Sequence, residues 1–177
     1  AGCVGQISIE GQRIKKRITG RTLPMFHKND DTPRARGFVS SNLMDGLKTS
    51  LRKILYCAMK RNLVKEVKVA QFGGYVSEHS GYHHGESSLM QAIVGMAQEF
   101  VGSNNINLLM PNGQFGTRLS GGKDSARERY IFTEINPLTR YIYREADDKI
   151  LNYLNDDGLM VEPIFYAPII PMVLVNG

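Results

Sequence analysis

Residues 86–101 read ESSLMQAIVGMAQEFV, and their apolar positions recur at the spacing of an amphipathic helix. The apolar face is formed by Leu89, Met90, Ile93, Met96, Ala97, Phe100 and Val101. Gly102 follows at the position where a glycine commonly ends a helix in the left-handed conformation. The pattern therefore predicts a helix from about Glu86 to Val101, with Gly102 as its C-terminal cap.

A second helical pattern lies upstream and begins at Thr49, which we expect to be the N-cap. Its apolar stripe consists of Leu51, Ile54, Leu55 and Ala58. Residues 78–85 form a glycine-bearing turn, so helix, turn and helix could make a DNA-reading unit. The same pattern also suits two helices that only pack in a core. Residues 65–71 fit either a strand or a helix.

After Gly102 the sequence favours short strands and turns. Turn signals occur at residues 111–113 and 155–158, and Tyr130 to Phe132 is a strand candidate. Residues 1–38 read as short strands or loop and hold too few apolar residues for a core of their own. The sequence thus predicts an α+β fold.

Composition places the chain among globular proteins, with 42% hydrophobic and 22% charged residues in 177. No apolar run approaches the roughly 18 residues that span a bilayer, and no signal peptide is apparent. Cys3 and Cys57 fit neither a metal site nor a disulfide framework, which favours a reducing, intracellular location.

The net charge of +5 is unevenly distributed. Residues 1–38 carry eight basic and three acidic side chains, whereas residues 39–177 carry fourteen of each sign. Within the latter, residues 45–68 are basic and residues 145–162 are acidic. A basic face suits a polyanion such as nucleic acid, but a solvated charged surface explains the same pattern.

Three short motifs could carry chemistry. His83 and His84 are adjacent on a turn, where they diverge and lack a third ligand, so contacts to phosphate are favoured over a metal. Residues 113–125 combine glycines with Arg118 and Lys123, which could hold a phosphate or simply form two turns. In the pair Arg129-Tyr130 a guanidinium could favour the phenolate and hold a phosphate oxygen.

Taken together, these motifs resemble the breakage-and-rejoining region of type IIA DNA topoisomerases over residues 43–177. The resemblance rests on DGLK (45–48), RK (52–53), EVKVAQ (66–71), YHHGE (82–86), FVGSNN (100–105), GQFGTRL (113–119), GGKDSA (121–126), RYIFT (129–133) and PIIPMVL (168–174). These blocks occur in the family's order.

The resemblance implies a winged-helix DNA-gate core followed by a β-rich start of the tower region. It implies double-strand DNA breakage and rejoining through a 5′-phosphotyrosyl intermediate, with Tyr130, Arg129 and His84 as the catalytic residues. The residues that would contact DNA are Lys48, Arg52, Lys53, His83, Gln114, Arg118 and Lys123. Arg127-Glu128 departs from the family's Ser-Pro and places a negative charge beside the tyrosine.

The family's cofactors are Mg²⁺, held by acidic residues of a separate Toprim domain, and ATP. No Asp-x-Asp motif of that kind occurs here, so we assign no metal ligand to this chain. We expect a fragment of a homodimeric, DNA-binding parent enzyme, inactive alone and not associated with a membrane. Its location would be the nucleus or the cytoplasm of the host cell.

The first 40 or so residues instead resemble the largest subunit of a eukaryotic-type multisubunit RNA polymerase. The matching pieces include EGQRI (10–14), RTLP (21–24) and RGFV (36–39). We therefore expect three segments, at 1–42, 43–135 and 136–177, with the first joined as a chimera. The alternatives are an engineered, non-catalytic antigen or scaffold, and a fragment of RNA polymerase.

Overall fold

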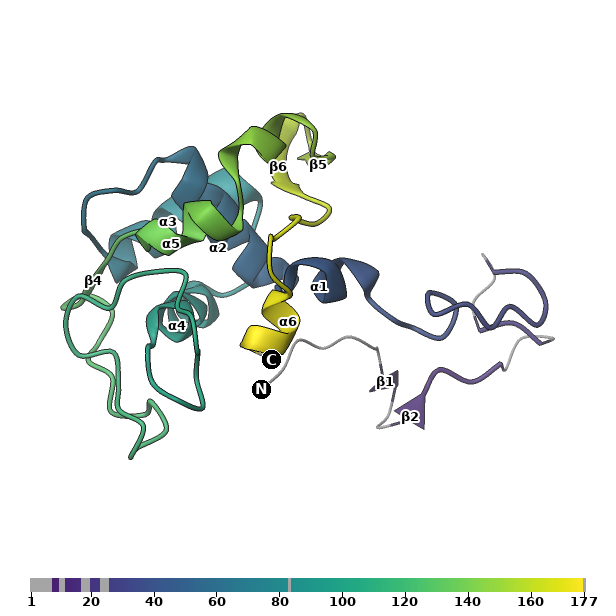
Figure 1. The fold of residues 1–177 in the computed structure, drawn as a ribbon, viewed down its shortest axis with the longest axis horizontal. Helices are drawn as coiled ribbons and strands as arrows, with labels where there is room; N and C mark the ends of the chain where they lie inside the picture. Colours follow the sequence, from purple (N-terminus) through teal and green to yellow (C-terminus); the bar gives the residue numbers. More distant parts are fainter. Residues whose placement is uncertain (1–7, 10–11, 17–19, 23–25, 83, 177) are drawn as a thin grey trace.

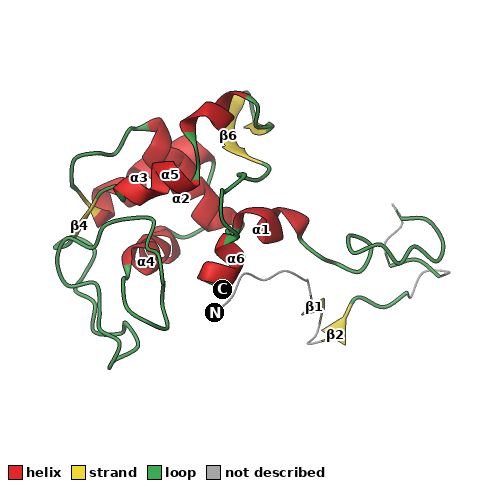
Figure 2. Ribbon diagram, viewed as in Figure 1, coloured by secondary structure: helices red, strands yellow, loops and turns green. Residues whose placement is uncertain are grey.

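The computed structural model describes residues 8–9, 12–16, 20–22, 26–82 and 84–176. Its centre is a body of three helices, α2 (Thr49–Lys60), α3 (Val69–Ser80) and α4 (Glu86–Ala97) (Figures 1 and 2). Their apolar faces meet in one core, which includes Ile54, Leu55, Phe72, Leu89 and Ile93. Burial of these side chains is the main stabilising term for the body.

Helix α3 is not apparent from the sequence pattern, in which residues 65–71 fit a strand as well as a helix. Two consecutive glycines, Gly73 and Gly74, lower the local helix propensity. Packing between α3 and α4 explains the glycine at position 73, because a Cβ there would lie 3.1 Å from the Met90 side chain. The helix-turn-helix unit is therefore α3, a turn at residues 81–85, and α4.

Gly81 ends α3 in the left-handed conformation, with φ of 58°. A Cβ at this position would lie 2.2 Å from a carboxylate oxygen of Asp156. Glycine therefore suits the left-handed backbone at this position, and a larger residue would also have to displace the Asp156 side chain.

Two helix boundaries differ from the prediction. Lys48 rather than Thr49 is the N-cap of α2, and Thr49 is the first helical residue. Helix α4 ends at Ala97, not Val101, because the Asn104 amide donates to the carbonyl oxygens of Gly95 and Gln98, both at 2.7 Å. This side chain satisfies the last carbonyl groups of the helix, so no cap at Gly102 is needed.

A small antiparallel sheet joins the helical body to the segment that carries Tyr130. Strand β3 (Val67–Lys68) pairs with β4 (Phe132–Thr133), with Val67 opposite Thr133. Isolated bridges join Leu109 to Ile135 and Asn112 to Phe132. Tyr130 itself precedes β4, so the predicted strand begins two residues later than expected.

The segment 136–177 is a mixture of helix and strand, whereas the resemblance implied a β-rich region. It contains α5 (Pro137–Ile142), a 3-10 helix η1 (Glu145–Lys149), the antiparallel strands β5 (Tyr153–Asp156) and β6 (Leu159–Pro163), and α6 (Met172–Val175). The Asn136 side chain caps α5, and Pro137 occupies its first turn. The predicted turn at residues 155–158 is confirmed as the β5–β6 connection.

The described residues between 8 and 38 lie away from the helical body in Figure 1. They include the two-residue strands β1 (Ser8–Ile9) and β2 (Gln12–Arg13), and α1 (Ser40–Asp45) leads from them into α2. The predicted mixture of helix and strand is confirmed, while the winged-helix assignment and the three-segment division remain predictions. Among the described residues, no helix has the length and apolar character required to cross a membrane.

Candidate nucleic-acid interface

Tyr130 lies at the end of a tight turn whose backbone is fixed to the start of α3. Its N–H donates to the Arg127 carbonyl at 2.9 Å. The first two N–H groups of α3, at Val69 and Ala70, donate to the carbonyl groups of Ile131 and Glu128 at 3.0 and 3.1 Å. The turn therefore has a fixed position, yet the Tyr130 side chain is 65% exposed.

Arg129 lies against its neighbour, with its guanidinium carbon 4.9 Å from the centre of the Tyr130 ring. Such a contact is a cation–π interaction, which at an exposed site contributes about 0.5–1 kcal/mol. Both side chains face solvent. A cation thus accompanies an accessible phenol, which suits an anionic ligand at this turn.

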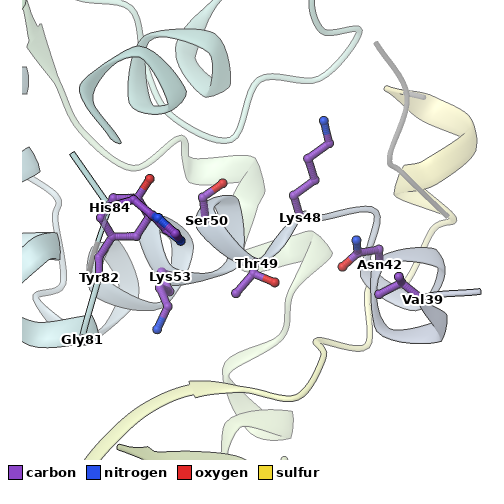
Figure 3. A pocket seen from close by; sticks show the side chains of 9 residues that line it. All are labelled: Val39, Asn42, Lys48, Thr49, Ser50, Lys53, Gly81, Tyr82 and His84. Carbon is purple, nitrogen blue, oxygen red and sulfur yellow. The ribbon is translucent and has the colours of Figure 1, made fainter. Parts of the chain in front are cut away.

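Lys48, Lys53 and His84 line one pocket of about 450 Å³, together with Tyr82 (Figure 3). The rings of Tyr82 and His84 meet edge to face at 5.4 Å. In Figure 3 the Lys48 and Lys53 side chains extend in opposite directions from α2. Among the described residues, no hydrogen bond or ring contact links this pocket to Tyr130.

Arg52 requires a correction, because the structure places it in the core rather than on a DNA-facing surface. It is 3% exposed, and its Nε lies 2.6 Å from the Asp45 carboxylate. Its Nη2 also donates to the Asn42 side chain at 3.1 Å and to the Leu47 carbonyl at 3.0 Å. With its donors used internally, Arg52 is not placed to contact a phosphate in this structure.

Lys53 also forms an internal ion pair. Its Nζ lies 2.8 Å from a carboxylate oxygen of Glu162 and donates to the Ser80 carbonyl. The Glu162 side chain is 2% exposed and that of Lys53 is 13% exposed. Lys53 therefore joins α2 to β6, and only part of it reaches the pocket surface.

The loop at residues 113–125 places Gln114, Arg118 and Lys123 on the surface. The backbone N–H and the hydroxyl of Thr117 each donate to the Asp124 carboxylate at 2.8 Å, which closes the loop. These hydrogen bonds lower the pKa of Asp124 below its usual value. Neither Arg118 nor Lys123 forms an ion pair with any residue that the structure describes.

Sequence reasoning missed the acidic partners of this region, Asp45 and Glu162. Asp45 is seven residues from Arg52, but Glu162 lies 109 residues from Lys53, so no local pattern could pair them. His83, also predicted to contact DNA, lies outside the described residues. In the part of the chain that the structure describes, no group of three or more His, Cys, Asp or Glu side chains could hold a metal ion.

Two family models match the chain. The model of the DNA gyrase/topoisomerase IV family matches residues 41–177, and the RNA polymerase Rpb1, domain 4 model matches residues 1–39. A solved structure of the Plasmodium falciparum topoisomerase II DNA-binding, cleavage and re-ligation domain superposes with a TM-score of 0.76 and 60% identity. That superposition covers 77% of this chain and 19% of the other.

Curated relatives agree with this match. The probable DNA topoisomerase 2 of Dictyostelium discoideum is 64% identical, and the DNA topoisomerase 2 of Saccharomyces cerevisiae is 59% identical, each over 136 residues. These alignments cover 77% of this chain but only 9% and 10% of those proteins. The Pisum sativum DNA topoisomerase 2 aligns at 55% over 174 residues, which covers 96% of this chain and 12% of that protein.

The pea alignment thus extends into the N-terminal segment that also matches the RNA polymerase model. Residues 41–177 are matched by the family model, the relatives and the solved structure alike. The chain therefore belongs to the type II DNA topoisomerases and spans part of their breakage-rejoining region.

Proposed function

We propose that this chain breaks and rejoins DNA through a covalent bond between Tyr130 and a DNA 5′ end. The observation that carries the proposal is the Tyr130 turn. Its backbone is hydrogen-bonded to the start of α3, its phenol is exposed, and the Arg129 guanidinium lies 4.9 Å from its ring. A fixed, accessible nucleophile beside a cation is the arrangement that attack on a phosphodiester requires.

In the proposed step the Tyr130 hydroxyl gives up its proton and its oxygen forms a bond to phosphorus. The bond from phosphorus to the 3′ oxygen breaks, and that oxygen takes a proton to become a 3′ hydroxyl. The phosphotyrosyl ester keeps the energy of the original linkage, so attack by the 3′ hydroxyl reverses the step. Arg129 stabilises the charge that develops on the phosphoryl oxygens.

Cys57 is a poor rival nucleophile among the described side chains. It is fully buried, and burial raises the pKa of its thiol to about 12. Because only the thiolate is a strong nucleophile, Cys57 stays unreactive at neutral pH.

We further propose that His84 acts at the scissile phosphate, and that Lys48, Gln114, Arg118 and Lys123 contact the DNA backbone on either side of the Tyr130 turn. Support comes from the exposure of Arg118 and Lys123 and from the pocket that Lys48 shares with His84. Such contacts are electrostatic, so binding should depend steeply on salt and little on sequence.

The chain spans about a tenth of the length of the curated relatives cited above. Magnesium, ATP and a second copy of the protein are therefore proposed for a longer protein. The described residues provide no cluster for a metal, so its ligands would come from elsewhere. A nuclear location is likewise a proposal, and one relative is named as mitochondrial.

We propose that residues 1–39 derive from the largest subunit of an RNA polymerase, and so have a different origin from residues 41–177. The match of the RNA polymerase family model to residues 1–39 supports this proposal. The pea alignment over 96% of the chain argues for a topoisomerase origin instead. A fragment of RNA polymerase is disfavoured as the identity of the whole chain, because that model matches only residues 1–39.

The experiment that tests the proposed chemistry maps the covalent bond. Residues 41–177 would replace the matching part of the Saccharomyces cerevisiae relative, and the purified protein would be incubated with magnesium and duplex DNA and then denatured. We expect protein bound to the 5′ ends of the broken strands and a nucleotide adduct on the peptide that contains Tyr130. An adduct at a 3′ end, or on another peptide, would contradict the proposal.

A further inference from the structure

The C-terminal hairpin of β5 and β6 lies against the end of α3, where the turn that carries His84 begins. Strand β6 packs against both α2 and α3. Two contacts of the hairpin fall at Ser80, the last residue of α3, and at Gly81, which ends the helix. The position of the turn therefore depends on residues that are distant from His84 in the sequence.

The first contact passes through Lys53. Its Nζ lies 2.8 Å from a carboxylate oxygen of Glu162 and also donates to the Ser80 carbonyl oxygen. The Glu162 side chain is 2% exposed, and Ser80 is fully buried. A carbonyl at the end of a helix has no partner within the helix, so the ammonium satisfies it and also opposes the negative end of the helix dipole. Lys53 thus joins the end of α3 to β6.

The second contact is made at the backbone of Gly81. A carboxylate oxygen of Asp156 lies so close that a Cβ at Gly81 would be 2.2 Å from it. The Gly81 N–H donates to the Ser77 carbonyl, and the Tyr82 N–H donates to the same oxygen at 3.4 Å. These hydrogen bonds continue from α3 into the turn, so a movement of the end of α3 would also move Tyr82.

His84 lies two residues after Tyr82 and contacts its ring. The two rings meet edge to face, with their centres 5.4 Å apart. The pocket drawn in Figure 3 is lined by both rings and by Lys53 and Gly81. Lys53 itself extends from α2 in the direction opposite to Lys48. The place of the His84 ring therefore follows from the backbone that Lys53 holds.

We propose that Lys53 is a positioning residue: with Glu162 as its counter-ion, it holds the Ser80 carbonyl and thereby places His84 at the scissile phosphate. Lys53 acts through the protein backbone and not by contact with DNA. Glu162 is needed because an ammonium without a counter-ion is costly to bury. This inference rests on the proposed function of His84 and adds the residues that position it.

The test uses a hybrid protein, with residues 41–177 placed within the Saccharomyces cerevisiae relative, and follows adduct formation over time at saturating duplex DNA with magnesium. Lys53→Met combined with Glu162→Leu removes the bond to Ser80 without leaving a buried charge. We expect the rate of adduct formation to fall roughly 10- to 100-fold, since a misplacement of about 1 Å can have an effect of that size. The affinity for DNA should stay close to the unmodified value, which separates a positioning role from a binding role.

Two control variants separate positioning from stability. Glu162→Gln keeps Lys53 and its bond to Ser80, so it should slow the reaction less than the double variant although it unfolds more easily. Val161→Ala is the matched control, because Val161 is 2% exposed in the same strand and its truncation weakens packing but keeps the ion pair. Its rate should stay close to the unmodified one. A rate that follows stability across the three variants would overturn the positioning role.

Two further measurements also decide the matter. In the full chain without DNA, hydrogen exchange at the Gly81 amide should be roughly tenfold faster in the double variant, because the end of α3 opens more readily. Unchanged exchange would overturn the positioning role, whereas an unmodified hybrid that forms no adduct would overturn the proposed chemistry alone. If the double variant binds DNA more weakly and lowers the slope of log affinity against log salt by about one, Lys53 contacts a phosphate and the positioning role is wrong.

Discussion

The start of α2 and the loop at residues 113–125 both hold basic residues in motifs that resemble DNA-binding sequences, yet the fold uses them in opposite ways. In α2, Arg52 and Lys53 turn inward to Asp45 and Glu162. In the loop, Arg118 and Lys123 are exposed and form no ion pair with a described residue, while the Asp124 carboxylate accepts two hydrogen bonds from Thr117. Whether a basic residue of such a motif forms an internal ion pair or stays on the surface therefore depends on which acidic side chains the fold places beside it.

The largest expected effect is on stability, at Arg52. Replacing Arg52 with alanine would leave the Asp45 carboxylate buried without its ion-pair partner. Loss of one partner of a buried pair typically costs about 3–5 kcal/mol of the free energy of unfolding. Urea unfolding should show this loss, whereas Arg118→Ala, as the exposed control, should change the free energy by less than about 0.5 kcal/mol. Equal stability of the two variants would mean that the inward role of Arg52 is wrong.

Glu162→Gln should have a smaller effect of the same kind. Glutamine keeps the shape but not the charge, so Lys53 loses its carboxylate while it keeps the Ser80 carbonyl and some solvent. We expect about 1.5–3 kcal/mol of destabilisation in the same urea measurement, the size of one hydrogen bond to a charged group and below that of Arg52→Ala. The double replacement Lys53→Met with Glu162→Leu should recover much of the loss, because it removes both charges. A double variant less stable than Glu162→Gln would contradict this account.

The loop cations should affect binding and leave stability unchanged. Arg118→Gln combined with Lys123→Gln should weaken binding to duplex DNA and reduce the slope of log affinity against log salt by about two. Fluorescence anisotropy at several salt concentrations measures both quantities. Arg144→Gln with Lys149→Gln removes the same charge from an exposed part of the acidic segment and serves as the control. An identical decrease in both double variants would indicate that net charge alone sets the affinity.

The smallest expected effect concerns the N-terminal segment, whose described ion pairs are local, since Lys16 and Arg36 both pair with Asp31. Deletion of residues 1–38 should leave the melting temperature of the remainder nearly unchanged, because segments with few core contacts contribute little. Differential scanning calorimetry would measure the melting temperatures of the full chain and of the shortened chain. A fall of many degrees would show that the segment is integrated with the helical body.

Much of the helical body was predictable from the sequence. The stripes of Leu51, Ile54 and Leu55 and of Leu89 and Ile93 predicted α2 and α4, because apolar spacing reflects burial on one face. Helix α3 was not predictable in this way, since Gly73 and Gly74 disfavour a helix locally and tertiary packing overrides that preference. The end of α4 depended on Asn104, whose amide reaches the helix only after the chain has folded back.

The candidate site likewise has features that local sequence predicts and features that depend on tertiary packing. The adjacency of Arg129 and Tyr130 and the surface position of Arg118 and Lys123 follow from short-range sequence, and the structure agrees with both. The burial of Arg52 and Lys53 could not be predicted, because it depends on packing and, for Lys53, on an acid 109 residues away. A short sequence motif therefore does not reveal the acidic partners that lie far away in the sequence.

The most direct test of the central claim compares two exposed tyrosines. Tyr130 is 65% exposed and Tyr141 is 72% exposed, so replacing either with phenylalanine removes one accessible hydroxyl. Each change would be made in residues 41–177 placed within the Saccharomyces cerevisiae relative, and protein–DNA adducts would be counted after incubation with magnesium and DNA. We predict that Tyr130→Phe abolishes the adduct but still binds DNA, whereas Tyr141→Phe forms it at the unmodified level. An adduct that persists in Tyr130→Phe would contradict the assignment of Tyr130 as the nucleophile.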